Sequence, residues 1–207
     1  NQHQRYIKIL SDLGCLVTTL KAEPDLPDSV FIEDIAVVFP EIAVLTRPGA
    51  ISRRLERETI EKALSPYRDI LKIIEPGTID GGDVLTLGRQ VFIGKSSRTE
   101  SNAVEQMKKI LIPFGYKVNE VDVKGCLHLK SAVTQVGQKV LLANPDWIDP
   151  MNFPDWDIIE VDPSEPYAAN ALWVGGSVIY PDGYIKTRQR LIDHGIKIES
   201  IDISELA

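Results

Sequence analysis

The sequence contains only two cysteines, Cys15 and Cys126, among its 207 residues. Two cysteines form neither a disulfide framework nor a zinc-ligand set, and this scarcity is typical of a reducing compartment, so we expect a cytoplasmic protein. The chain also lacks any apolar run approaching 18 residues, because Glu33, Asp34 and Glu41 interrupt the best candidate. It opens on no charged-then-apolar leader, so the sequence predicts neither a membrane span nor a secretory signal.

Positive charge is scarce as well. The chain has 30 acidic and 23 basic residues, and its formal net charge is -7. This balance argues against a nucleic-acid or anionic-membrane partner and is compatible with a cationic ligand. An apolar content of 43% is enough for a sizeable core. No low-complexity linker divides the chain, so we expect a single domain over residues 1–207.

A pattern of two short β-rich runs around a tight turn occurs four times, at intervals of roughly 40 to 50 residues. The four predicted hairpins are Ile35 to Thr46, Val84 to Gly94, Ala132 to Ala143 and Ala171 to Tyr180. Three of them are followed by an amphipathic helix, predicted over Ser52 to Leu64, Glu100 to Phe114 and Thr187 to His194. A closing strand is predicted after each helix, over Ile70 to Ile74, Lys117 to Val121 and Lys197 to Ile201. The repeated unit is therefore strand-strand-helix-strand.

The third copy and the N-terminus depart from this unit. Prolines interrupt Asp146 to Trp156, so we expect a short or irregular helix there, followed by a closing strand at Asp157 to Val161. A helix over Gln2 to Leu13 and a strand over Leu16 to Leu20 form the second half of a unit. Four and a half units predict a ring of units around an axial channel, whereas coincidental spacing in an open α/β sheet is the alternative.

The segment Pro27 to Val38 places adjacent carboxylates, Glu33 and Asp34, in what otherwise reads as a buried strand. Successive strand side chains point to opposite faces, so one carboxylate is expected to be buried. A buried, unpaired carboxylate costs several kcal/mol, so a cationic partner is expected. That partner is either a ligand or an internal side chain, and an exposed strand end is a further alternative.

Three other motifs carry candidate chemistry. In Gly77 to Val84 two glycines stand between Asp80 and Asp83, where they permit positive φ or close backbone approach, although an ordinary turn into a strand would look similar. His128 stands alone between leucines, where a structural histidine is common, but a buried carboxylate partner would suit it for general acid/base work. Asp80 lies at the corresponding entrance of the preceding unit.

Arg47 and Arg98 each directly follow the second strand of a hairpin. Equivalent positions in a ring converge near one end. Two arginines there would bind a carboxylate through paired hydrogen bonds, whereas solvated arginines at strand ends are the ordinary alternative.

Together these motifs resemble the guanidine-modifying superfamily with the pentein fold, a five-bladed α/β-propeller, and most closely its dimethylargininases. The resemblance covers nearly the whole chain and adds the blocks Thr46 to Ala50 and Tyr167 to Asn170 to the motifs above. Arginine and agmatine deiminases of this superfamily typically have an aspartate two residues after the histidine. This chain has Lys130 there, which favours the dimethylargininase branch.

The resemblance implies a cationic small-molecule substrate, either methylated arginine or arginine. Asp28 and Asp34 would hold its guanidinium with Glu33 close by, and Arg47 and Arg98 would bind its α-carboxylate. The resemblance implies no metal or organic cofactor, and it is compatible with a homodimer.

His128 would transfer protons, with Asp80 as its orienting partner, while a cysteine thiolate attacks the central guanidinium carbon. The family's nucleophilic cysteine lies a little beyond the segment that matches Ile201 to Leu206, so the resemblance implies a nucleophile that is not among these 207 residues. The opening hairpin of the first unit is likewise expected to be missing from them. Cys126 shares a strand face with His128 in this reading, but a packed cysteine is the favoured interpretation.

Two alternatives stay open at this level. The first is a deiminase or dihydrolase acting on unmethylated arginine, which needs the same residues apart from a methyl pocket. The second is a non-catalytic binding protein, because the same fold also serves as a ribosome-associated translation factor. Retention of the guanidine-site residues argues against this second alternative.

Overall fold

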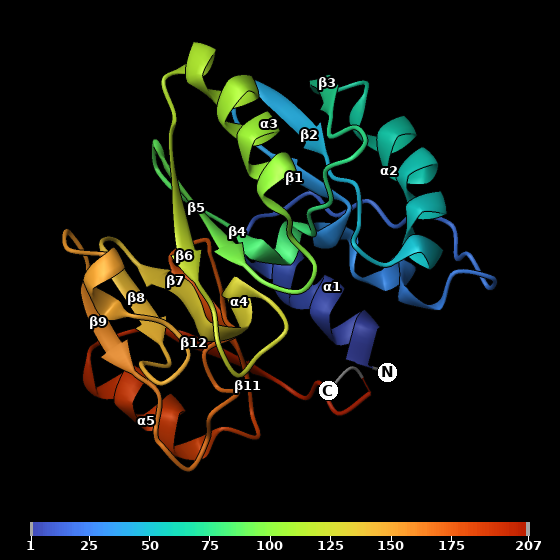
Figure 1. Ribbon diagram of the computed structural model, residues 1–207. Helices are drawn as coiled ribbons and strands as arrows, with labels where there is room; N and C mark the ends of the chain where they lie inside the picture. The colour runs from blue at the N-terminus through green and yellow to red at the C-terminus, as the bar shows by residue number, and fades with distance from the viewer. Residues whose placement is uncertain (1, 206–207) are drawn as a thin grey trace. The chain divides into compact units, whose positions relative to one another are not determined.

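The computed structural model describes residues 2–205 (Figure 1). These residues fall into two compact units. One consists of the residues up to Thr19 together with those from Ser131 onward, and the other is Leu20–Lys130. The single domain over 1–207 stays a prediction. Within the described residues, no helix is long and apolar enough to cross a membrane.

The unit Leu20–Lys130 contains two three-stranded sheets, β1-β2-β3 and β4-β5-β6. In each, the first two strands pair antiparallel as a hairpin and the third pairs parallel with the second. A parallel neighbour requires a crossover, which α2 and α3 provide. The bounds are β1 Ala36–Val38, β2 Ile42–Leu45, α2 Arg57–Leu64, β3 Asp69–Lys72, β4 Val84–Leu87, β5 Gln90–Lys95, α3 Ser101–Leu111 and β6 Lys117–Asp122.

The other unit repeats this arrangement in the sheets β7-β8-β9 and β10-β11-β12. The predicted irregular helix of the third copy is confirmed as the short 3-10 helix η6, Pro150–Asn152. The remaining bounds are α1 Gln2–Asp12, α4 Leu129–Ala132, β7 Val133–Gly137, β8 Val140–Ala143, β9 Asp157–Glu160, β10 Leu172–Val174, β11 Ser177–Pro181, α5 Ile185–Asp193 and β12 Ile198–Ile201. Shorter 3-10 helices are η1 Pro27–Val30, η2 Ile32–Asp34, η3 Ile51–Glu56, η4 Gly81–Asp83 and η5 Ile112–Phe114.

Each unit has its own apolar core. In Leu20–Lys130, α3 buries the face formed by Val104, Met107 and Leu111 against apolar side chains of the two sheets. The helical segment then ends at Gly115, whose φ of +78° is typical of a helix C-cap and closes the turn before β6. The second core gathers residues of β7, β8, β9 and β11 around Tyr180 and Leu191.

Two sequence predictions about strands are wrong. Pro27 to Asp34 forms η1 and η2, in which Phe31 N donates to Asp28 O and Asp34 N donates to Phe31 O, so the backbone is satisfied locally. The apolar residues that suggested burial are exposed, with Phe31 at 41%. The predicted strand at Leu16 to Leu20 is irregular, because no described strand pairs with it, and Leu16 is 97% exposed.

Candidate active site

Asp34, at the end of η2, has a buried carboxylate held from two sides. Its Oδ1 accepts a hydrogen bond from Gly82 N at 2.9 Å, and its Oδ2 accepts one from Arg53 Nη1 at 2.5 Å. The Arg53 guanidinium also donates to both carboxylate oxygens of Glu56, at 3.0 and 2.9 Å. Asp34 therefore has the expected cationic partner, and that partner is an internal side chain.

Arg53 also bonds the loop that carries Asp34. Its Nη2 donates to the carbonyl oxygens of Asp28 and Phe31 at 3.0 and 3.1 Å. Burial alone would lower the pKa of Arg53, but hydrogen bonds to Glu56 and Asp34 outweigh it and raise that pKa. One guanidinium therefore fixes the η1–η2 segment and neutralises its buried charge.

Gly81 and Gly82, which follow Asp80, are required because atoms of other segments approach their backbone too closely for a Cβ. A Cβ on Gly81 would lie 1.9 Å from Glu33 O, and a Cβ on Gly82 would lie 2.7 Å from Asp34 Oδ1 and 2.9 Å from His128 Nδ1. Neither glycine has positive φ. Of the two reasons that the sequence offered for glycine, close backbone approach is confirmed.

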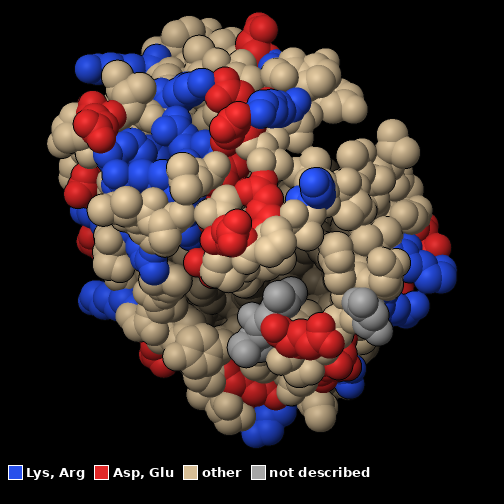
Figure 2. Space-filling view, turned by 90° about the vertical axis from the view of Figure 1, so that its right-hand side faces the viewer, with Lys and Arg blue, Asp and Glu red and all other residues tan. Residues whose placement is uncertain are grey.

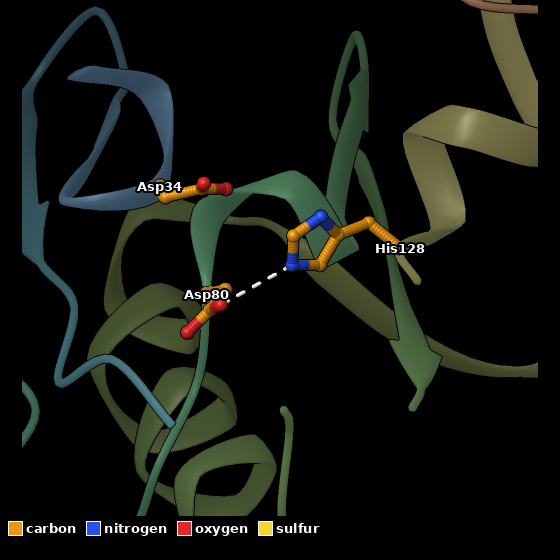
Figure 3. A group of neighbouring side chains, drawn as sticks. All are labelled: Asp34, Asp80 and His128. Atoms are coloured by element: carbon orange, nitrogen blue, oxygen red, sulfur yellow. Dashed lines mark hydrogen bonds and ion pairs between the residues drawn. The ribbon is translucent and has the colours of Figure 1, made fainter. Parts of the chain in front are cut away.

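His128 and Asp80 form the predicted hydrogen bond. Nε2 of His128 lies 3.2 Å from Oδ2 of Asp80, and Gly49 N donates to the other carboxylate oxygen at 2.8 Å. Figure 3 shows the imidazole reaching toward Asp80, with the Asp34 carboxylate on the neighbouring side. Asp80 is fully buried and His128 is partly buried. The three side chains thus share one small volume.

The electrostatics of this pair favour its charged form. Burial would lower the pKa of His128, but the hydrogen bond to Asp80 and the charges of Asp34, Asp83 and Asp80 raise it overall. Burial would raise the pKa of Asp80, but hydrogen bonds from His128 and Gly49 and the charges of His128 and Arg98 lower it overall. The protonated form of His128 is therefore favoured more than in a free imidazole.

We expect the ring resonances of His128 to titrate in an NMR experiment with a midpoint above 6.5, because its pKa is raised. In Asp80→Asn the midpoint should move down, since the principal acceptor of the imidazolium loses its charge. His128→Gln assigns the signal by removing it. An unchanged midpoint in Asp80→Asn would contradict this account of the pair.

Asp83 is a further buried carboxylate at the site. It accepts hydrogen bonds from Ser96 Oγ at 2.5 Å, Thr99 Oγ1 at 2.7 Å and Leu129 N at 2.9 Å. Ser96 Oγ in turn accepts a bond from Arg98 N at 3.0 Å. Burial raises the pKa of Asp83, and these donors partly offset that rise. Asp83 therefore connects the turn that carries Arg98 with the residue after His128.

The two predicted carboxylate-binding arginines differ in their surroundings. Arg47 is buried and bonds Glu75 Oε1 at 2.5 Å and Gly77 O at 3.3 Å. Within residues 2–205 the Arg98 guanidinium has no hydrogen-bond or ion-pair partner, although its charge acts on Asp80. The two chain segments meet at Gly49, where a Cβ would lie 2.9 Å from Arg98 O.

The other two predicted substrate-binding acids lie at the surface. Glu33, with a side chain 63% exposed, pairs with Lys130 at 2.9 Å, and Asp28 is exposed in η1. The structure thus brings Asp34, Asp80 and His128 together but does not place Asp28 or Glu33 in the same group of side chains. Their roles stay predictions.

A metal ion is the other ligand that this group of side chains could hold. One ligand atom from each of Asp34, Asp80 and His128 lies within 4.8 Å of the others. The donors are already engaged, however, because Arg53 occupies one oxygen of Asp34 and the imidazole donates to Asp80. A metal ion would have to displace these hydrogen bonds to bind the carboxylate oxygens. The arrangement therefore suits a ligand that donates further hydrogen bonds to Asp34 better than a metal ion.

Cys126 lies two residues before His128 but is a poor nucleophile. Burial, followed by the charge of Asp83, raises the pKa of its thiol to about 11. Its Sγ also lies 3.3 Å from His128 O, in hydrogen-bonding geometry. The thiol is thus protonated near neutral pH, which agrees with the interpretation of a packed cysteine.

Known proteins match nearly the whole chain. The model of the N,N dimethylarginine dimethylhydrolase family, eukaryotic, matches residues 1–153. The N(G),N(G)-dimethylarginine dimethylaminohydrolase of Pseudomonas aeruginosa is 36% identical over 206 residues, which cover 99% of this chain and 81% of that protein. The chain belongs to the dimethylarginine dimethylhydrolase family. The enzyme of the same name from Streptomyces coelicolor is also 36% identical, over 99% of this chain and 79% of its own.

Solved structures agree with this family assignment. The structure of the Pseudomonas aeruginosa protein, a cysteine-to-serine variant complexed with citrulline, matches 99% of this chain and 81% of its own with a TM-score of 0.94. The predicted pentein fold, an α/β-propeller of repeated ββαβ units, is confirmed.

Sequence reasoning missed Arg53, the cation that pairs with Asp34. Arg53 stands in a surface-like Ser-Arg-Arg run, so it carries no local signal of partnership. The only available signal for Arg53 was the requirement that a buried carboxylate has a cation nearby.

Proposed function

We propose that this protein hydrolyses the guanidinium group of dimethylarginine, releasing citrulline and dimethylamine. The hydrogen-bonded His128 and Asp80 beside the Asp34 carboxylate carry the proposal, together with membership of the family. A guanidinium is a planar cation with several N–H donors, and a carboxylate accepts two of them. Asp34 would hold it, with Asp28 and Glu33 as further acceptors at the entrance.

The reaction needs a nucleophile and a proton donor. A cysteine thiolate adds to the central guanidinium carbon, and the C–N bond to dimethylamine breaks as His128 gives its proton to that nitrogen. Water then attacks the resulting thiouronium carbon and loses a proton to His128. The C–S bond breaks, the hydroxyl group of the adduct gives its remaining proton to solvent, and neutral citrulline leaves as the thiolate is restored. Asp80 stabilises the imidazolium in both half-reactions.

The residues at the other end of the ligand would bind its amino-acid part. Arg98 has a guanidinium without a described partner, and Arg47 lies on the adjoining segment. Two charge-assisted donors there favour an α-carboxylate. Cys126 is not assigned as the nucleophile, because its thiol is protonated. The nucleophilic cysteine implied by the family resemblance stays a prediction, as does the cytoplasmic location.

The alternative substrate is unmethylated arginine, whose hydrolysis would release ammonia. The acids and arginines above would bind either molecule. Related deiminases typically have an aspartate at the position of Lys130. Lys130 pairs with Glu33 instead, which supports the methylated substrate. A non-catalytic protein of this fold is the weaker alternative, because it has no use for a His128–Asp80 pair.

A product assay tests the proposal. Incubation of the intact polypeptide with dimethylarginine should give citrulline and dimethylamine in equal amounts, and Cys126→Ser should keep the rate of the unsubstituted protein. The same assay with arginine, read by ammonia release, measures the competing activity. Faster turnover of arginine would favour the alternative substrate, and loss of all activity in Cys126→Ser would make Cys126 the nucleophile.

A further inference from the structure

Arg54 and Arg57 are two partly buried arginines that lie three residues apart, where η3 continues into α2. Residues at this spacing in a helical segment are neighbours on one side of it. Arg54 Nε donates a hydrogen bond to Pro48 O at 3.2 Å, and Arg57 Nη2 donates one to Ile73 O at 3.3 Å. Pro48 and Ile73 follow β2 and β3, which are parallel neighbours, so both guanidiniums are held against adjoining segments.

No carboxylate of the described residues forms an ion pair with either arginine. Each acid of η3 and α2 already has a cation of its own, in the pairs Glu56–Arg53, Glu58–Lys62 and Glu61–Lys72. The neighbouring Arg47 has its counter-charge in Glu75. Arg54 and Arg57 therefore place two like charges side by side without a counter-charge, which is unfavourable at this spacing.

Several N–H donors of this pair also lack an acceptor. The Nε of Arg57 is buried and has no hydrogen-bond partner, and no described residue accepts a hydrogen bond from the Nη atoms of Arg54. Burial lowers the pKa of Arg57, the charge of Glu61 opposes this, and the charges of Arg47 and Arg54 add to it. Buried polar atoms are nearly always satisfied, so these donors call for an acceptor from outside the chain.

The two charges and the free donors indicate the class of that acceptor. Phosphate is close to a dianion and has several acceptor oxygens, so it matches two guanidiniums better than a carboxylate with a single charge does. Figure 2 views the molecule from the side on which Figure 1 labels α2, and Lys and Arg side chains gather on this face with Asp and Glu among them. Both arginines are partly exposed, so an anion can reach them from solvent.

We propose that Arg54 and Arg57 form a binding site for a phosphate group, either of inorganic phosphate or of a phosphorylated small molecule. The phosphate would accept hydrogen bonds from Arg57 Nε and from the Nη atoms of Arg54. The proposal does not rest on the proposed function, because the contacts of the two arginines involve none of Asp34, Asp80 and His128.

Calorimetry with inorganic phosphate, at low ionic strength and at a pH where phosphate is a dianion, tests the site. Arg57→Gln and Arg54→Gln each remove one guanidinium. Each variant should bind phosphate about tenfold or more weakly, the equivalent of one lost charge-assisted hydrogen bond. The same titration with glycerol phosphate distinguishes the sources, because tighter binding of glycerol phosphate indicates a phosphorylated molecule and tighter binding of inorganic phosphate indicates the free ion.

Two control variants separate this site from other positive charges. Arg5 is exposed on α1, so Arg5→Gln makes the same charge change elsewhere. Arg98 also has a guanidinium without a described partner, so Arg98→Gln tests the other place where phosphate can bind. Both controls should bind phosphate as tightly as the unsubstituted protein. Absence of binding to the unsubstituted protein, equal affinity of Arg57→Gln and Arg5→Gln, or loss of binding in Arg98→Gln alone would each overturn the site.

A second measurement keeps the test decisive where a glutamine variant does not fold. Phosphate added to the unsubstituted protein should shift the NMR signal of the Arg57 Nε–H group, because this buried donor gains an acceptor. Arg57→Lys keeps the charge and assigns the signal by removing it. Thermal unfolding without phosphate shows which variants are folded. A signal that does not move at saturating phosphate would contradict the site.

Discussion

Asp80→Asn should lower the turnover of dimethylarginine by a factor on the order of 10² to 10⁴, the range that general acid/base catalysis contributes. The amide keeps an oxygen that can accept the hydrogen bond from Gly49 N, so the local backbone should be retained. The neutral amide cannot stabilise the imidazolium by charge, so the pKa of His128 should fall. A smaller fraction of the protein would then carry the proton that the leaving amine needs.

The measurement is the pH profile of kcat/KM for Asp80→Asn, with Asp122→Asn as the control variant measured in the same way. Asp122 is an acid in an exposed ion pair with Lys95, and the carboxylates that act on the pKa of His128 are Asp34, Asp83 and Asp80, so loss of Asp122 makes the same charge change without removing one of them. Asp122→Asn should keep the rate of the unsubstituted protein. Full activity of Asp80→Asn would show that the hydrogen bond has no role in catalysis.

Arg53→Met should destabilise the protein by about 3 to 5 kcal/mol, the usual cost of removing one partner from a buried ionic group. The substitution leaves the carboxylates of Asp34 and Glu56, with side chains 9% and 3% exposed, without their counter-charge. It also frees the Asp28 and Phe31 carbonyl oxygens that hold the η1–η2 segment. Urea unfolding, analysed by linear extrapolation, measures the change.

A second variant shows whether the unpaired charge is the cause. Arg53→Met combined with Glu56→Gln removes one of the two stranded carboxylates and should recover part of the lost free energy of unfolding. Lys62→Met, which breaks an exposed pair on α2, should leave the stability unchanged. Equal small effects of Arg53→Met and Lys62→Met would contradict a buried ionic cluster.

The sequence predicted the repeats well, because turn residues and hydrophobic periodicity are local signals. Each ββαβ unit is marked by a reversal, three of the four by an amphipathic stretch, and α3 by a glycine after the helix, so most elements could be placed from neighbouring residues. The Asp80–His128 contact was also predictable, because equivalent positions in adjacent repeats are expected to meet. Both predictions succeeded because the same sequence pattern recurs in successive segments of the chain.

The failures concern properties that the repeat does not determine. Val30, Phe31 and Ile32 form an apolar run that is typical of a buried strand, yet the 3-10 turns direct them outward and leave Asp34 inward. Whether an acidic side chain is met by a ligand or by Arg53 depends on contacts between distant segments. Charge pairing of this kind has no period in the sequence.

The buried carboxylate of Asp83 has a consequence for any redesign of this site. It anchors the turn before Arg98 and the amide after His128 at once, so one carboxylate links the positions of these two segments. A substitution at Asp83 would therefore remove the hydrogen bonds of both segments together. The Arg98 turn and the backbone next to His128 cannot be redesigned independently through this residue.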